Sequence, residues 1–171
     1  IVGSSANAFS YTLNKGTKAE NYNIGKTEGT LTVTNRTEKY GIKVEANSGE
    51  KTYNGKEQKV TGFVTNEFTV NGQKYTVSGL TAGAEGTDAG EYTAKVTGTA
   101  MVTDAAGNVV TDQFNVTTVD GKLTIKPVEI ELTANSAEKP YDGTALTANG
   151  YKITKGAFAD KEGLASVTVE G

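Results

Sequence analysis

The chain has no cysteine, no histidine and no tryptophan, and its 171 residues include only 2 prolines and 1 methionine. Without cysteine it forms no disulfide bond and binds no metal through thiolates. Without histidine it lacks the side chain that most often serves as a general base near neutral pH. Together these absences exclude thiol nucleophiles and histidine-based catalysis.

Charge and hydropathy exclude two further classes of function. The 17 basic and 20 acidic residues are mixed along the chain and give a net charge of −3. No basic cluster is present that could neutralise several phosphates, so we expect no nucleic-acid binding. No apolar run approaches the roughly 20 residues of a membrane helix, so we expect no membrane insertion in this segment. Because there is no signal-peptide pattern and no initiator Met, we expect the chain to be an excerpt of a longer protein.

The carboxylates are the remaining candidates for catalysis or metal binding. They are scattered through turns such as TDAAGN, TDAGE and ADKEG, with no apolar surroundings that would raise a pKa. TDAAGN and GAFADKEG place oxygen ligands near glycine, but neither has the spacing of a calcium loop closed by a bidentate Glu. We therefore predict that the chain is not an enzyme and has no metal or cofactor site.

What the sequence does contain is strand-forming residues and turn signals. Thr is abundant, 21 residues are Gly, and Val, Ile or Leu alternate with polar residues in GIKVEAN, GTLTVTN, GKLTIKP and VEIELTA. This period of two is typical of a sheet with one buried face. Asn71-Gly72 lies between two such runs and predicts a type I′ hairpin, and a second hairpin is expected around Asp104–Asn108. No window has a helical period, so we predict an all-β fold with almost no helix.

Three segments of the sequence recur in order. IKVEANSGEKTYNG from Ile42 matches IELTANSAEKPYDG from Ile130, 88 positions later. NYNIGKTEGTLTVTN from Asn21 matches QFNVTTVDGKLTIKP from Gln113, and YTVSG from Tyr75 resembles VTVEG from Val167, both 92 positions apart. This pattern predicts a tandem repeat. Residues 1–34 are then the C-terminal half of one unit, 35–126 a complete unit, and 127–171 the N-terminal half of the next.

A further signature lies in GTDAGEYTAKV. Asp88, Gly90 and Tyr92 have the spacing of the tyrosine corner of immunoglobulin-like sandwiches, in which the Tyr hydroxyl bonds to backbone a few residues upstream. Asp is expected to offer an acceptor in this loop, and Gly to permit its backbone angles. We therefore expect each unit to be an immunoglobulin-like β-sandwich.

These motifs resemble the YDG/MBG-type immunoglobulin-like repeats of bacterial, Gram-positive surface adhesins. The resemblance rests on the corner Asp88–Tyr92, on the closing GTLTV and GKLTI, and on two copies of a Lys-x-Tyr-Asp/Asn-Gly element. Those copies are Tyr53, Asn54 and Gly55, and Tyr141, Asp142 and Gly143. The resemblance implies an extracellular, cell-surface or cell wall-anchored location and a role without catalysis. Such repeats usually have Asp at the position that Asn54 occupies in this chain. A turn tolerates the exchange of Asp for Asn, whereas a site that needs a carboxylate does not.

The resulting interpretation is a structural stalk or spacer whose partners are neighbouring repeats of the same protein. In this interpretation the terminal half-units of different chains can complement each other head to tail. The alternative is an adhesive binding module for a host glycan or protein, to which Tyr53 or Tyr141 could contribute a stacking ring. For both tyrosines the main expectation is that the ring packs on the edge of the core while the next two residues form a turn.

The same resemblance raises the possibility of a Lys–Asn isopeptide bond, with Lys43 or Lys51 as the lysine and Asn115 as its partner. Such a bond needs a buried lysine in apolar surroundings, whereas both lysines lie in polar stretches.

Overall fold

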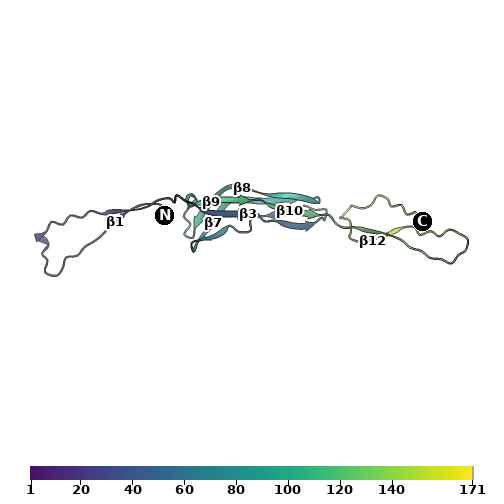
Figure 1. The fold of residues 1–171 in the computed structure, drawn as a ribbon, viewed down its shortest axis with the longest axis horizontal. Coiled ribbons are helices and arrows are strands. Elements are labelled where there is room, and N and C mark those ends of the chain that lie inside the picture. Colours follow the sequence, from purple (N-terminus) through teal and green to yellow (C-terminus); the bar gives the residue numbers. More distant parts are fainter. Residues whose placement is uncertain (171) are drawn as a thin grey trace. The chain divides into compact units, whose positions relative to one another are not determined.

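The computed structural model describes residues 1–170, and nearly all of its regular structure is β-strand (Figure 1). The strands of the N-terminal part are β1 (Gly3–Asn7), β2 (Gly29–Val33), β3 (Tyr40–Glu45), β4 (Gly49–Thr52), β5 (Gln58–Thr61) and β6 (Glu67–Val70). They are followed by β7 (Gln73–Gly86), β8 (Gly90–Asp104), β9 (Phe114–Val119), β10 (Gly121–Lys126), β11 (Glu131–Ala134) and β12 (Tyr151–Lys155). The helical content within residues 1–170 is two single 3₁₀ turns, η1 (Ala19–Asn21) and η2 (Thr111–Gln113). The predicted all-β class with almost no helix is confirmed.

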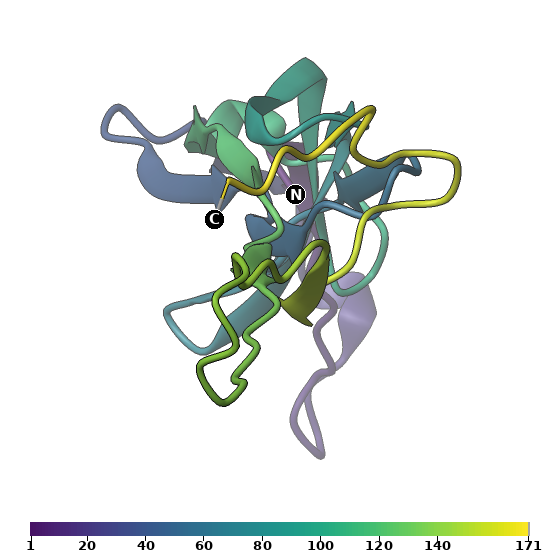
Figure 2. The same ribbon diagram turned by 90° about the vertical axis from the view of Figure 1, so that its right-hand side faces the viewer.

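Within residues 1–170 the strands form one six-stranded sheet and three two-stranded sheets. Figure 2 shows the same ribbon turned by 90° about the vertical axis. The large sheet has the order β4-β10-β8-β7-β5, with β6 also paired to β7. Its β10–β4 pair is parallel, whereas β10–β8, β5–β7 and β6–β7 are antiparallel. The small sheets are β1–β2, β3–β9 and β11–β12.

Contacts divide the chain into two compact units, each made of three segments. The first comprises Ile1–Ile42, Glu67–Ser78 and Ala100–Val116. Its core is centred on Phe114, which is 5% exposed and packs against the rings of Tyr75 and Tyr40 at centroid distances of 4.8 Å and 5.8 Å. Ile42, Val77 and Val102 are also buried. Alternation places these side chains on one face of their strands, as the sequence predicts.

The second compact unit comprises Lys43–Asn66, Gly79–Thr99 and the chain from Thr117 onward. Its buried side chains are Val44, Ala46, Gln58, Ala94, Leu123 and Ile125. The amide nitrogen of Gln58, the one polar member of this set, donates to the carbonyl of Thr52 at 3.0 Å, so the buried amide group has a hydrogen-bond partner.

Both predicted hairpins are confirmed. Asn71 and Gly72 have φ values of 49° and 76° between β6 and β7, the positive pair that a type I′ turn requires. At the second hairpin, Asp104 N donates to Asn108 O at 3.0 Å and Val110 N donates to Val102 O at 2.8 Å.

Two of the small sheets, β1–β2 and β11–β12, consist wholly of exposed residues. Apolar side chains on these strands remain in solvent, with Leu31 54%, Val33 56%, Leu132 43% and Ile153 43% exposed. Isolated two-stranded sheets of this kind are marginal in water, because they have no second layer to cover an apolar face.

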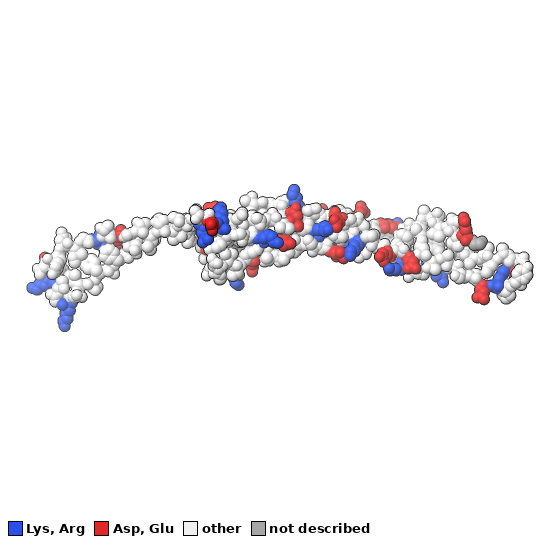
Figure 3. Space-filling model, in the orientation of Figure 1, with Lys and Arg blue, Asp and Glu red and all other residues white. Residues whose placement is uncertain are grey.

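Charged side chains of both signs are interspersed on the face drawn in Figure 3. Lys59 illustrates the pattern, since its Nζ lies 2.7 Å from a Glu57 carboxylate oxygen and 2.9 Å from one of Glu85. These hydrogen-bonded carboxylates raise the pKa of the Lys59 ammonium, so it stays charged throughout the neutral range.

Candidate functional site

The repeated Tyr-Asn/Asp-Gly element forms the same turn in both of its copies. Asn54 Oδ1 accepts a hydrogen bond from Lys56 N at 3.0 Å, and Asp142 Oδ1 accepts one from Thr144 N at 3.0 Å. These are Asx turns, in which the side chain replaces a backbone acceptor. A neutral amide and a carboxylate do this equally well, so the exchange of Asn for Asp leaves the turn intact.

Glycine, rather than the residue before it, adopts the left-handed conformation in these turns. Gly55 has φ 72° and Gly143 has φ 76°, whereas the non-glycine residues with positive φ are Asn71 and Lys161. Asn54 and Asp142 are thus outside the left-handed region. They act through their side chains instead.

Charge distinguishes the two turns. Lys139 Nζ lies 2.7 Å from Asp142 Oδ1 and also donates to Thr144. The hydrogen bond from Lys139, followed by those from Thr144, lowers the pKa of the Asp142 carboxyl. Asn54 cannot take part in an ion pair of this kind, so ionic chemistry is not a shared property of the motif.

The Ala-Asn-Ser segment that opens each motif copy also has recurring geometry. Asn47 N donates to Gly62 O at 3.0 Å, and its Nδ2 donates to Thr61 O at 2.9 Å. Asn135 makes the corresponding two bonds, to Gly150 O at 3.0 Å and to Asn149 O at 2.9 Å. Each partner lies 88 positions from its counterpart, which is the offset found in the sequence.

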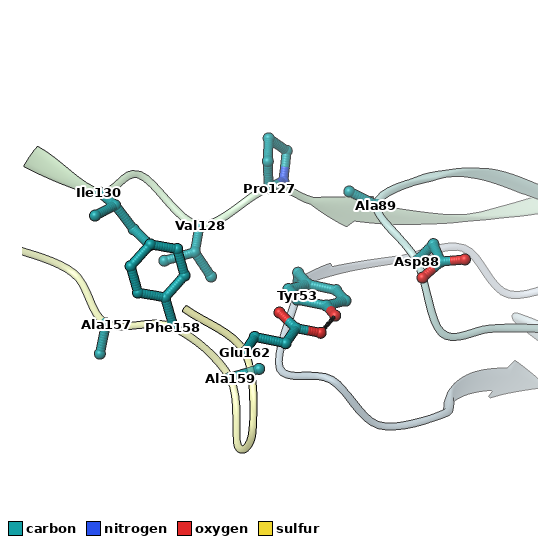
Figure 4. Close-up of a pocket in the computed structure, with 10 residues that line it drawn as sticks. All are labelled: Tyr53, Asp88, Ala89, Pro127, Val128, Ile130, Ala157, Phe158, Ala159 and Glu162. Carbon is teal, nitrogen blue, oxygen red and sulfur yellow. Dashed lines mark hydrogen bonds between the residues drawn. The ribbon is translucent and has the colours of Figure 1, made fainter. Parts of the chain in front are cut away.

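Tyr53 lines a pocket of about 320 Å³ in the second compact unit, together with residues from the turn that follows β12 (Figure 4). Its hydroxyl donates to the carboxylate of Glu162, and this hydrogen bond is the main cause of a raised Tyr53 pKa. Figure 4 shows Val128, Ile130 and Phe158 among the apolar residues of the lining. Tyr53 is half-buried, as expected for a ring that packs on the edge of a core.

Tyr141 does not have that environment. It is 97% exposed, so the expectation that this ring packs on the edge of the core is wrong for the second motif copy. The local turn is the same at both tyrosines. The difference therefore lies in what surrounds them, because Tyr53 has Glu162 and Ala159 beside it.

The chemistry available in the pocket is limited. Its other lining residues are Asp88, Ala89, Pro127, Ala157 and Ala159. The Glu162 carboxylate already accepts the Tyr53 hydroxyl, and the chain has no histidine or cysteine to serve as a base or nucleophile. Among residues 1–170 no group of three or more Asp or Glu side chains is placed to hold a metal ion. Most of the lining side chains are apolar.

The predicted tyrosine corner has the bond that defines it. Tyr92 Oη donates to the carbonyl oxygen of Asp88 at 2.9 Å. The acceptor is the backbone of Asp88 and not its side chain. The expectation that Gly90 supplies unusual backbone angles is wrong, because its φ is not positive and an added Cβ would meet only Tyr92, at 3.9 Å.

The glycine that this corner does require is Gly86, which the sequence signature did not include. A Cβ on Gly86 would lie 2.3 Å from the ring of Tyr92. The ring therefore lies directly over the backbone at Gly86. The sequence shows a glycine six residues before the tyrosine. That this position requires glycine becomes clear only once the position of the Tyr92 ring is known.

Asp104 closes the hairpin tip in TDAAGN. Its Oδ1 accepts from Ala106 N and Asn108 N, both at 2.9 Å, and its Oδ2 accepts from Asn108 Nδ2 at 2.9 Å. These bonds, led by the one from the Asn108 side chain, lower the pKa of the carboxyl below its ordinary value of 3.8. The oxygens that resembled calcium ligands thus serve the turn.

The lowered pKa predicts an acid-sensitive contribution of Asp104 to stability. Because the folded-state pKa is lower than the unfolded one, the contribution is complete above about pH 4. It is lost as the pH falls through the folded-state value. We expect the stability difference between the parent chain and Asp104→Asn, measured by urea denaturation, to be larger at pH 6 than at pH 2.5. A difference that is the same at both pH values would contradict this assignment.

The residues considered for an isopeptide bond lack the environment it requires. The Lys43 side chain is 61% exposed and its Nζ lies 3.3 Å from Glu45. Lys51 and Asn115 are exposed as well. A reactive lysine must be buried to lose its proton at neutral pH, so none of these residues is set up for that reaction.

No protein-family model matches the chain, and no curated protein or solved structure matches it significantly. Within residues 1–170 there is also no helix long and apolar enough to cross a membrane.

Proposed function

We propose that this chain is a non-catalytic structural module, a stalk or spacer built from tandem immunoglobulin-like β-sandwiches on a bacterial cell surface. The observation that carries the proposal is the recurrence of local geometry at the repeat offsets. Asn47 and Asn135 make equivalent bonds, as do the Asx turns at Asn54 and Asp142. Repeated units of this kind serve to set length, because each adds a fixed increment along the array.

The C-terminal halves of the proposed units support the same interpretation. The 3₁₀ turns η1 and η2 start 92 positions apart, at Ala19 and Thr111. Each is closed by the same bond, from Tyr22 N to Ala19 O and from Phe114 N to Thr111 O. The strands that follow, β2 and β10, begin at Gly29 and Gly121, again 92 positions apart.

The tyrosine corner supports the immunoglobulin-like class of sandwich. In a surface array the partners of each unit are its neighbours, and its location is extracellular or cell wall-anchored. With strands of about 10 residues, each unit contributes about 35 Å of length. An adhesive tip carried by such an array would stand well clear of the cell envelope.

A binding module for a host glycan or protein is the second candidate, favoured by Tyr141, a large ring that is 97% exposed. Tyrosine is common in binding interfaces because its side chain presents a rigid apolar ring with a polar hydroxyl.

The two functions differ in what the purified chain binds. We expect no binding to immobilised mucins, matrix proteins or glycan arrays, and an elongated particle in small-angle X-ray scattering. Specific binding that is lost in Tyr141→Ala and kept in Tyr11→Ala, a control ring that is 50% exposed, would instead establish the adhesive module.

A further inference from the structure

The second compact unit continues across the boundary between two proposed repeats. It includes Lys43–Asn66, from the repeat at 35–126, and the chain from Thr117 onward, which enters the next repeat at residue 127. Between the end of β10 at Lys126 and the start of β11 at Glu131 the chain has only the residues PVEI. The contacts across this short connection indicate how the two repeats are joined.

The connection by itself leaves torsional freedom. The ring of Pro127 fixes its own φ and restricts the preceding Lys126 to extended conformations. No such restriction applies to Val128, Glu129 and Ile130, whose backbone dihedrals have several allowed regions. Neighbouring domains with a small interface are expected to move relative to each other. A fixed joint therefore needs contacts outside the connection.

Tyr53 supplies such a contact from the first side of the joint. Its backbone N donates to Lys126 O at 2.8 Å, which places residue 53 beside the end of β10. Its hydroxyl donates to the carboxylate of Glu162 in the next repeat, and Figure 4 shows this bond between the two side chains. One residue therefore bonds through its backbone to one side of the connection and through its side chain to the other.

The turn that presents Glu162 has an uncommon backbone conformation. Glu162 N donates to Ala159 O at 3.0 Å, and Lys161, the third residue of this turn, has φ 66°. A type II turn requires a positive φ at its third residue, where Gly or Asn is usual. A lysine held in this region is strained, and such strain persists only where the surrounding contacts impose it.

The segment that leads into this turn is held at two further points. A Cβ added at Gly55, in the first repeat, would lie 2.9 Å from the Cβ of Ala159. Gly156 has φ 72°, and a Cβ there would lie 2.1 Å from Glu129 O in the connection. The adjacent Lys155 forms an ion pair with the Glu129 carboxylate. The segment therefore lies against the first repeat at one point and against the connection at the other.

Apolar side chains of the second repeat gather at the same contact. Four of them are half-buried and line the pocket of about 320 Å³ beside Tyr53: Val128, Ile130, Phe158 and Ala159. Most other side chains from residue 127 to residue 170 are exposed. The partial burial of these four side chains favours the closed contact through the hydrophobic effect, in addition to the hydrogen bond.

We propose that the Tyr53 edge of the repeat at 35–126 is the docking surface for the turn 159–162 of the next repeat, and that this contact, rather than the connection alone, fixes the joint between them. The inference rests on the proposed function, because it takes the two parts as consecutive repeats of a stalk. The joint is closed while Glu162 accepts the Tyr53 hydroxyl, and it opens when the turn leaves the pocket. Because the contact is small, it opens before the sandwich unfolds and gives the stalk a point of flexion under load.

Spin labels on the two sides of the joint measure its freedom directly, since the chain has no cysteine of its own. Lys95→Cys on β8 and Lys152→Cys on β12 provide exposed labelling positions outside the pocket. Double electron–electron resonance then gives the distribution of distances between the labels. We expect a narrow distribution in the labelled parent chain and one about twofold wider or more in Tyr53→Ala. Tyr53→Phe should lie in between, because it keeps the ring and loses the hydrogen bond.

Tyr141→Phe is the matched control for Tyr53→Phe. Tyr141 has the same place in its motif copy and is 97% exposed, so the loss of its hydroxyl should leave the distribution unchanged. Ala159→Leu tests the other side of the contact without a change at Tyr53. The larger side chain has too little room beside Gly55, so the distribution should widen. Ala165→Leu, at an exposed position of the same repeat, should leave it narrow.

A distribution as wide in the parent chain as in Tyr53→Ala would overturn the inference. So would a distribution that stays narrow in both Tyr53→Ala and Ala159→Leu, because the connection alone would then fix the joint. Either result leaves the stalk function standing if the chain binds no ligand. Specific binding of a glycan or protein would instead remove the stalk function, while a width that depends on Tyr53 would still establish the joint.

Discussion

Leu123→Ala is expected to destabilise the chain by about 3 kcal/mol, within the range measured for leucines removed from protein cores. Leu123 is 0% exposed on β10, the strand that pairs with both β8 and β4. Truncation removes the buried side-chain surface and leaves a cavity. Because β10 is paired with a strand on each edge, the backbone cannot easily move to fill that cavity. The second compact unit has few other buried apolar side chains to compensate. Urea denaturation followed by circular dichroism measures the change.

Leu31→Ala is the matched control for this experiment. Leu31 occupies the corresponding position of β2 and is 54% exposed, so its truncation removes little buried surface. We expect a change below about 0.5 kcal/mol. Equal effects of the two substitutions would mean that the two strands do not differ in burial, contrary to the structure.

The regular strands and tight turns were predictable because their determinants are local. Alternating side chains define the buried face of β3 and β10, and Asn71-Gly72 defines a turn through its own backbone preferences. The bond from Tyr92 to Asp88 spans only four residues and follows from a spacing visible in the sequence. Such features can be predicted without knowledge of the rest of the fold.

The features that the sequence did not reveal depend on contacts between distant segments. Tyr53 and Tyr141 lie in similar motifs, EKTYNG and EKPYDG, yet Tyr53 contacts Glu162 whereas Tyr141 is 97% exposed. Gly86 is required only because the ring of Tyr92 lies over it, whereas Gly90, which belongs to the tyrosine-corner signature, has no positive φ. A motif therefore predicts the local turn, while tertiary neighbours decide which of its residues are indispensable.

Gly121→Ala is expected to cost on the order of 3 kcal/mol, the upper part of the range for overpacking in a protein interior. The added Cβ would lie 2.2 Å from Asn47 O, 2.8 Å from Asn47 C and 2.9 Å from Ala46 O. All three are backbone atoms, so no change of side-chain rotamer relieves the overlap. The backbone itself must move, and that weakens the adjacent bonds from Ala46 N to Val119 O and from Lys122 N to Ser48 Oγ.

Gly41→Ala provides the control, because an added Cβ in this β3 position meets nothing within 4 Å and φ is not positive. We expect it to be neutral or slightly stabilising in the same urea titration, since alanine loses less backbone entropy than glycine on folding. If Gly121→Ala were equally neutral, the close approach of the Asn47 backbone to β10 would be wrong. The substitution therefore tests, within a single folded chain, the contact that joins the Ala-Asn-Ser segment to the start of β10.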